Sequence, residues 1–218
     1  MYTEIETRIA PLGLTILGAL HPAHQSVKAL TGGTLLMLGT QGSFWTHFRT
    51  SAEALDGQAD PVDRWSRRVI SDLADAVSAT PYFPFGGPPY TPFVNWALAT
   101  GRVFSTPAGP MVHDTMGMMI SFRGALHFEA EFALPPPPLS QSPCKSCADK
   151  PCLTTCPVKA FDGSGTYDLE ACHGYLDTPA GQTCMTTGCL ARLACPLSSN
   201  SSRDPTQTSH HMRYFHPR

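Results

Sequence analysis

The sequence has little charge and no long apolar run. Only 15% of its 218 residues are charged, and 15 Lys and Arg stand against 17 Asp and Glu, for a net charge of −2. A general nucleic-acid-binding protein needs a concentrated basic face, so we expect no nucleic-acid partner. No apolar run reaches the ~18 residues of a membrane span, so we expect no membrane partner either. The run from Leu14 to Leu20 is short and follows no basic segment, so we expect no signal peptide and a cytoplasmic location.

Cysteine is absent from residues 1–143 and concentrated in the segment that follows. All eight cysteines lie between residues 144 and 195. Thiols used only for packing would be scattered, so this concentration indicates a chemical requirement. The two runs of four are Cys144-x2-Cys147-x4-Cys152-x3-Cys156-Pro157 and Cys172-x11-Cys184-x4-Cys189-x5-Cys195-Pro196. In a reducing compartment, clustered cysteines are more often metal ligands than disulfides.

The proline after each run favours iron–sulfur clusters. The bacterial ferredoxin run is C-x2-C-x2-C-x3-C-P, and its fourth cysteine ligates the other cluster of the pair. The x4 spacing between Cys147 and Cys152 departs from that pattern and makes the motif less specific. With the same crossover, the chain is predicted to hold two [4Fe–4S] clusters. The predicted ligands are Cys144, Cys147, Cys152 and Cys195 for the first cluster, and Cys156, Cys172, Cys184 and Cys189 for the second.

Two other uses of the cysteines remain open. Four thiolates are a common zinc set, but zinc ligands usually recur as two close C-x2–4-C pairs, and only Cys144 and Cys147 are so close. Four disulfides would require an oxidising compartment, for which the sequence carries no signal. We therefore keep a zinc-stabilised interaction protein as an alternative.

The segment before the cysteines is predicted to mix helices and strands. Short apolar runs at Gly13–Leu20 and Thr34–Leu38 indicate buried strands, and one or two more strands are expected within Met116–Phe132. Asp60 is expected to cap a helix that starts at Pro61, and apolar residues then recur three and four apart to about Ser78. A second helix is expected from Thr91 to about Thr100.

Four consecutive prolines mark the clearest boundary in the chain. They cannot continue a helix or a strand, and they favour an extended spacer. We therefore expect an α/β domain over residues 1–134, a spacer over 135–143, a ferredoxin-like module over 144–196, and a tail or extended arm over 197–218. Within the module, Asp168 is expected to cap a short helix from Leu169 to about Leu176 that carries Cys172, with the other cysteines on loops.

The order of the module resembles the ferredoxin part of epoxyqueuosine reductases, which are related to reductive dehalogenases. The segment from Asp168 to Leu176 is similar to that family's helix with a lone cysteine, and Cys184, Cys189 and Cys195-Pro196 resemble its closing set. More weakly, 88–100 and 106–128 are similar to part of its corrinoid-binding domain. The resemblance implies an α+β or α/β N-terminal domain of the nitroreductase-like class, with cobalamin or flavin as a further cofactor. Where the family carries its catalytic Asp, this chain reads Phe85-Gly86-Gly87-Pro88-Pro89, without an acid.

The function expected from these residues is electron transfer between a donor and an acceptor redox protein. The alternative is an oxidoreductase, a corrinoid- or flavin-dependent reductase without the family's catalytic Asp, and no catalytic residue can be identified. His113 and Asp114 could serve proton transfer, although polar loop residues are commoner. The loop from Pro84 to Pro92 could bring its backbone close to a planar cofactor, but it is interpreted as a rigid turn before a helix.

Overall fold

The chain forms two compact units, and each unit consists of two separate stretches of the sequence. The computed structural model describes residues 1–25, 27–138 and 141–217. The first unit comprises Met1–Val103 and Ser121–Ser140, and the second comprises Phe104–Ile120 and Gln141–Arg218. The expected boundaries at 134 and 143 therefore miss one feature: residues 104–120 belong to the unit that holds the cysteines. Strand β4 (Val103–Phe104) spans the point where the chain first passes between the units.

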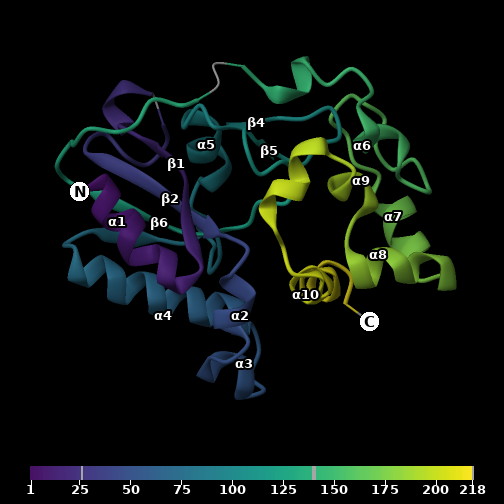
Figure 1. Cartoon of the computed structure of the whole chain (residues 1–218), viewed down its shortest axis with the longest axis horizontal. Helices are drawn as coiled ribbons and strands as arrows, with labels where there is room; N and C mark the ends of the chain where they lie inside the picture. Colours follow the sequence, from purple (N-terminus) through teal and green to yellow (C-terminus); the bar gives the residue numbers. More distant parts are fainter. Residues whose placement is uncertain (26, 139–140, 218) are drawn as a thin grey trace. The chain divides into compact units, whose positions relative to one another are not determined.

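The first unit is built on a four-stranded antiparallel sheet (Figure 1). The strands, in the order in which they lie side by side, are β1 (Leu14–Leu20), β2 (Thr34–Thr40), β6 (Phe122–Phe128) and β3 (Thr80–Tyr82). In the register, Ile16 faces Leu38 and Leu36 faces Leu126. The two short apolar runs are thus confirmed as strands, and the predicted mixture of helix and strand is confirmed with them.

Helices cover this sheet from both faces. Leu36 and Leu38 share a buried cluster with α1, α2 and α4, whereas Met37 points the other way and is also fully buried. Opposite Met37 in β1 lies Gly18, where a Cβ would stand 2.7 Å from the side chain of Thr100 at the end of α5. The helical segments are α1 (Tyr2–Ile9), η1 (Ala10–Leu12), η2 (Pro22–His24), α2 (Phe44–Phe48), α3 (Ala52–Leu55), α4 (Pro61–Ala76) and α5 (Phe93–Ala99).

The long helix α4 forms where the apolar stripe predicts it, although the residue directly before it differs from the expectation. Trp65 is buried at the centre of the stripe, and its ring meets that of Phe44 edge to face with 5.1 Å between centroids. Pro61 occupies the first helical position as expected. Asp60, however, makes no side-chain cap and has a left-handed backbone with φ of 51°. The predicted capping by Asp60 is therefore wrong.

The second unit consists of short helical segments joined by loops. After β5 (Val112–His113) they are η3 (Pro143–Lys145), α6 (Pro151–Thr154), α7 (Leu169–Leu176), η4 (Pro179–Gly181), α8 (Gln182–Thr187), α9 (Leu190–Leu193), η5 (Pro196–Ser201) and α10 (Pro205–Phe215). The expected helix with its Asp168 cap is confirmed, because Asp168 Oδ1 accepts from the Ala171 N–H at 2.9 Å. The expected tail instead contains η5 and α10.

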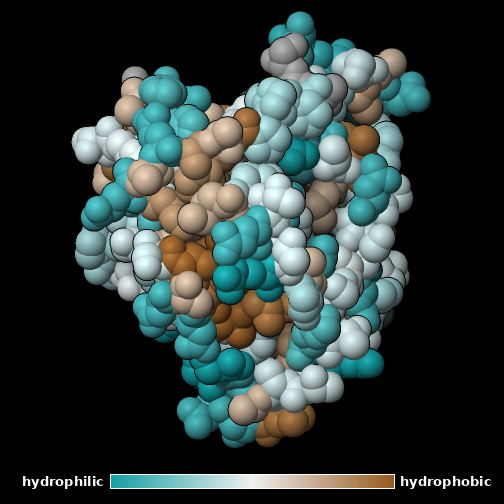
Figure 2. All heavy atoms as spheres, turned by 60° about the vertical axis from the view of Figure 1, so that its left-hand side comes forward, coloured by the Kyte–Doolittle hydropathy of each residue, from teal (hydrophilic) through white to brown (hydrophobic). Residues whose placement is uncertain are grey.

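The surface reflects the modest charge of the sequence. In Figure 2, teal and white residues separate the brown hydrophobic surface into patches rather than leaving it continuous. Across the described ranges, none of the helices combines the length and the apolar character needed to cross a membrane.

Candidate metal centre

The eight cysteines are carried by short helices and the residues next to them. Cys144 lies in η3, Cys152 in α6, Cys172 in α7 and Cys184 in α8. The expectation that only Cys172 lies on a regular element is therefore wrong. The other four lie just outside such elements: Cys147 and Cys156 in the chain around α6, Cys189 directly before α9, and Cys195 directly before η5. All eight thiols are free.

Four of the sulfurs influence one another and form the first set: Cys144, Cys147, Cys152 and Cys195. Burial is the main cause that raises the pKa of the Cys144 thiol, and Cys195 and Cys147 raise it further. Burial also raises the pKa of Cys152, with added contributions from Cys144, Cys195 and Cys147. Lys150 is the nearby cation that opposes this effect at Cys144. These thiols therefore resist becoming a group of thiolates unless a cation compensates them.

The remaining sulfurs form the second set: Cys156, Cys172, Cys184 and Cys189. Burial raises the pKa of Cys172, and Cys189 and Cys156 raise it further. The pKa of Cys184 is raised by burial first and then by Cys189, Cys172 and Cys156. The sulfurs that influence one another thus follow the partition that the ferredoxin crossover predicts, with Cys195 beside the first run and Cys156 beside the second. The metal-ligand assignment itself stays a prediction.

The first set lines a cavity of about 270 Å³. All four of its cysteines contribute to the wall, and Val112 and Met118 make part of the wall apolar. This volume greatly exceeds the roughly 30 Å³ that one water molecule occupies. The cavity therefore has room for a group larger than a single metal ion. Exposed residues Ser146 and Lys150 also line it, so the cavity reaches the surface.

The second set is surrounded by hydrogen-bond donors. The Tyr167 hydroxyl donates to Cys172 Sγ at 3.0 Å, and the Ala160 N–H donates to Cys156 Sγ at 3.4 Å. The Leu190 N–H donates to Cys184. Burial and the bond to Cys172 together raise the pKa of the Tyr167 hydroxyl, which therefore stays protonated as a donor. Donors of this kind stabilise negative charge on sulfur.

Helix α10 covers the second set. Met212 of this helix is buried in one cluster with Cys184, Met185 and Leu176, and Cys172 packs against the same cluster. Gly188, four residues after Cys184, lets the helix approach closely, because a Cβ at that position would stand 2.1 Å from Thr208 Cγ2. The segment that the sequence suggests is a tail thus packs over Cys184 and Cys172 of the second set.

The spacing of the sulfurs bears on the kind of metal. Four thiolates on one tetrahedral zinc at about 2.3 Å would place the sulfurs only about 3.8 Å apart. In the described parts of the chain, the only three or more metal-binding donor atoms within 4.8 Å of one another come from His21, His24 and Glu131, not from any cysteines. Within the described residues, no three cysteine sulfurs therefore lie as close together as in a compact zinc site.

Two other predicted features lie outside the cysteine sets. His113 and Asp114 are both buried, and His113 Nδ1 lies 3.1 Å from Asp114 Oδ1. The Thr115 N–H also donates to this ring nitrogen at 3.2 Å, so the pair forms part of a folded turn. The loop at 85–89 contains the cis bonds Gly87–Pro88 and Pro88–Pro89 and leads toward α5.

Sequence reasoning missed several residues that shape the cysteine environment. No sequence pattern indicates a role for Tyr167, because the contact between its hydroxyl and Cys172 Sγ forms only in the folded chain. Met118 and Val112 come from a segment before the proline spacer and join the cavity wall through tertiary folding. For α10 a signal existed: Asp204-Pro205 repeats the Asp-Pro start of α4, and Asp204 Oδ1 accepts from the Thr206 N–H at 2.7 Å.

Comparisons with known proteins add no assignment to this site. No protein-family model matches the chain, and no curated protein matches it. A function for the cysteine unit has to be argued from its own residues.

Proposed function

We propose that the second unit holds two [4Fe–4S] clusters and transfers electrons singly between redox proteins. The observation that carries this proposal is the arrangement of the eight sulfurs in two sets of four, each of which joins three thiols of one run with one of the other. Cys144, Cys147, Cys152 and Cys195 would hold one cluster, and Cys156, Cys172, Cys184 and Cys189 the other. A bound cluster supplies a site that accepts and releases one electron.

The residues around the sulfurs suit such a role. Val112 and Met118 keep the wall of the first set apolar, which limits water around the sulfurs. Tyr167 and the Ala160 N–H hold hydrogen bonds on the second set, where they would stabilise the additional negative charge of a reduced state. The cavity reaches the surface at Lys150, where a redox partner would approach the first set.

The proposal is tested by purifying the chain without oxygen and analysing iron, sulfide and zinc. We expect a brown protein with about eight irons and eight sulfides, as two four-iron clusters require. The visible absorption should decrease on reduction. A colourless protein that contains zinc and lacks sulfide would overturn the electron-transfer proposal in favour of a zinc-stabilised interaction protein.

We also propose that the first unit has the nitroreductase-like fold that the resemblance implies. An antiparallel sheet with helices on both faces supports this class. The same purification tests the enzyme alternative, because cobalamin or flavin retained by the chain would indicate a reductase rather than a carrier. A first unit that retains neither, and binds neither when it is added, favours the carrier.

A further inference from the structure

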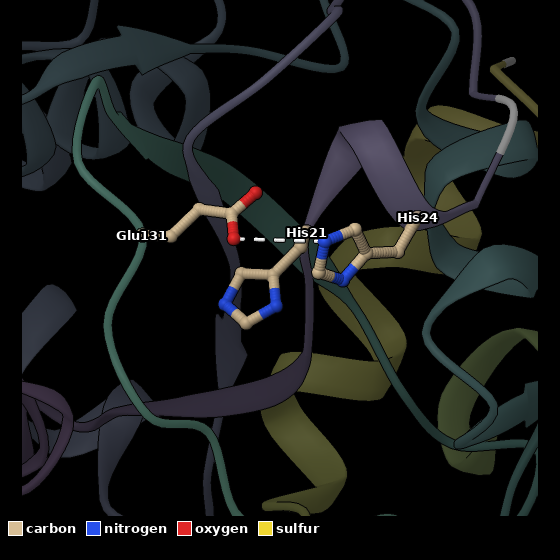
Figure 3. A group of neighbouring side chains, drawn as sticks. All are labelled: His21, His24 and Glu131. Carbon is tan, nitrogen blue, oxygen red and sulfur yellow. Dashed lines mark ion pairs between the residues drawn. The ribbon is translucent and has the colours of Figure 1, made fainter.

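Two histidines and a glutamate meet at one end of the sheet in the first unit, outside the unit that holds the cysteines. Their metal-binding atoms all lie within 4.8 Å of one another. His24 Nε2 lies 3.6 Å from Glu131 Oε2, and the rings of His21 and His24 meet edge to face with 5.2 Å between centroids. Figure 3 shows the three side chains converging from two separate segments of the chain.

The strand pairing brings these segments together. Leu20 at the end of β1 faces Leu35 of β2, and Leu35 faces His127 of β6, so one row crosses three strands. His21 follows this row directly, and the turn η2 brings His24 back beside it. Glu131 follows the last residue of β6, at the same end of the sheet. The grouping is therefore fixed by the sheet and not by an exposed loop alone.

A buried threonine holds the carboxylate segment in place. Thr34, fully buried at the start of β2, donates its hydroxyl to the Ala130 carbonyl at 3.0 Å. The same hydroxyl accepts from the Phe132 N–H at 3.2 Å. Glu131 thus lies between two anchored residues, and its backbone position is set before any ligand arrives.

One histidine already has the orientation of a metal ligand. His21 Nε2 lies 3.0 Å from the Phe132 carbonyl oxygen. Because a carbonyl only accepts, Nε2 carries the proton, and the neutral ring leaves the lone pair of Nδ1 available. Metal-binding histidines almost always donate their second ring N–H to a carbonyl or carboxylate in this way, which fixes tautomer and ring direction. An ion pair between His24 and Glu131 alone would not need this arrangement of His21.

We propose that His21, His24 and Glu131 form a binding site for a divalent transition-metal ion, with zinc as the best fit. Two imidazole nitrogens and one carboxylate oxygen are ligands that zinc accepts in tetrahedral sites, and three protein ligands leave the fourth position for water. Calcium and magnesium prefer all-oxygen sites. The outer side chains are 58% exposed at His24 and 41% exposed at Glu131, so they can move the short distance that ligation needs. This site is independent of the function proposed for the cysteines.

The test needs a readout for single histidines, because free thiols in the same chain also bind zinc. The whole chain, purified without oxygen and labelled with ¹⁵N, is titrated with Zn²⁺ alone while the imidazole ¹⁵N signals are followed. We expect Nδ1 of His21 and a ring nitrogen of His24 to shift together, while Nε2 of His21 keeps its proton. Histidine signals that do not move at about millimolar zinc would overturn the proposal.

Variants separate ligation from a simple ion pair. Glu131→Gln keeps the size of an exposed side chain and removes the carboxylate, and we expect at least a tenfold loss of zinc affinity at the two histidines, in the range seen when even supporting groups of metal sites are removed. His21→Ala should abolish the His24 shift. His47→Ala, which removes an exposed histidine of α2, is the matched control and should leave the titration unchanged. Unchanged affinity in Glu131→Gln would also contradict the site.

Discussion

The two sets of cysteines lie in one unit but have different surroundings. The first set, formed by Cys144, Cys147, Cys152 and Cys195, lines a cavity of about 270 Å³ that reaches exposed residues. The second set is packed under α10, with Met212 in the same buried cluster as Cys184. Each set has one buried and three partly exposed cysteines, so the two sets differ in what packs around them rather than in the exposure of the cysteines.

Hydrogen bonding and charge differ between the sets as well. At the first set, the Ser142 side chain hydrogen-bonds to the thiol of Cys144 and lowers its pKa. At the second set, a hydroxyl and two backbone N–H groups donate to three different sulfurs. Arg192 lies close enough to interact with Cys189, and burial lowers the pKa of its guanidinium. Both sets thus have a cation beside them, Lys150 at the first and Arg192 at the second. The additional donors favour the more negative, reduced state, so under the proposed function the second set should hold the electron longer.

The largest expected effect breaks the partition itself. Cys156→Ser should remove the cluster of the second set although Cys156 belongs to the first run, and Cys195→Ser should remove the cluster of the first set. The reason is that each of these sulfurs lies among the thiols of the other run. Iron analysis and electron paramagnetic resonance of the reduced variants should each show about half of the iron and one remaining signal.

The exposed neighbour Thr154→Ala serves as the control and should retain all iron. If Cys156→Ser instead removed the cluster held by Cys144, Cys147 and Cys152, the two runs would not cross over. The proposed ligand sets would then have to be exchanged.

Much of the fold could be predicted because it depends on local patterns. Strands β1 and β2 are short apolar runs between turn residues, and the stripe of α4 has helical spacing. The Asp168 cap at α7 was predictable for the same reason, since it links residues three apart. Asp60 shows the limit of this reasoning, because it has a left-handed backbone and its side chain makes no hydrogen bond to the helix it was expected to cap.

The surroundings of the cysteines could not be predicted in the same way. Helix α10 buries Gln207, Thr208 and Met212, so it has no apolar stripe and reads as a polar tail. Met118 reaches the cavity wall from residues 104–120, which precede the proline spacer, and its N–H donates to Ser198 Oγ at 3.1 Å. Contacts over 80 residues are set by the packed structure and leave no periodic signal in the sequence.

A smaller effect concerns solvent access. An iron chelator should remove iron from the first set before the second, because the first lines a cavity that reaches the surface, whereas Met212 of α10 packs over Cys184 of the second. Met212→Ala should reduce this difference, since it deletes buried side-chain volume above Cys184 at a cost of roughly 2 kcal/mol, the low end for such a truncation. The rate of iron removal is measured as the loss of visible absorption. The Cys156→Ser and Cys195→Ser variants, which should each keep one cluster, show which cluster a given rate belongs to.

The control for this experiment comes from the same helix. Tyr214→Ala removes a side chain of α10 that is 53% exposed, and it should leave both rates unchanged. Equal loss of the two clusters in the wild-type chain would show that α10 does not protect the second set.

The smallest expected effect isolates one hydrogen bond. Tyr167→Phe removes the hydroxyl that donates to Cys172 Sγ at 3.0 Å and leaves the ring, which stacks on Phe161 with 4.7 Å between centroids. The hydrogen bond stabilises the reduced state by about 0.5–1.5 kcal/mol, so its loss should lower the reduction potential by roughly 20–60 mV for one electron. A redox titration should show this shift for the second set alone. Tyr175→Phe is the matched control, because its hydroxyl donates to the Ala180 carbonyl at 3.0 Å and to no sulfur. A shift of equal size in both variants, or at the first set, would remove Tyr167 as a cause of the difference between the sets.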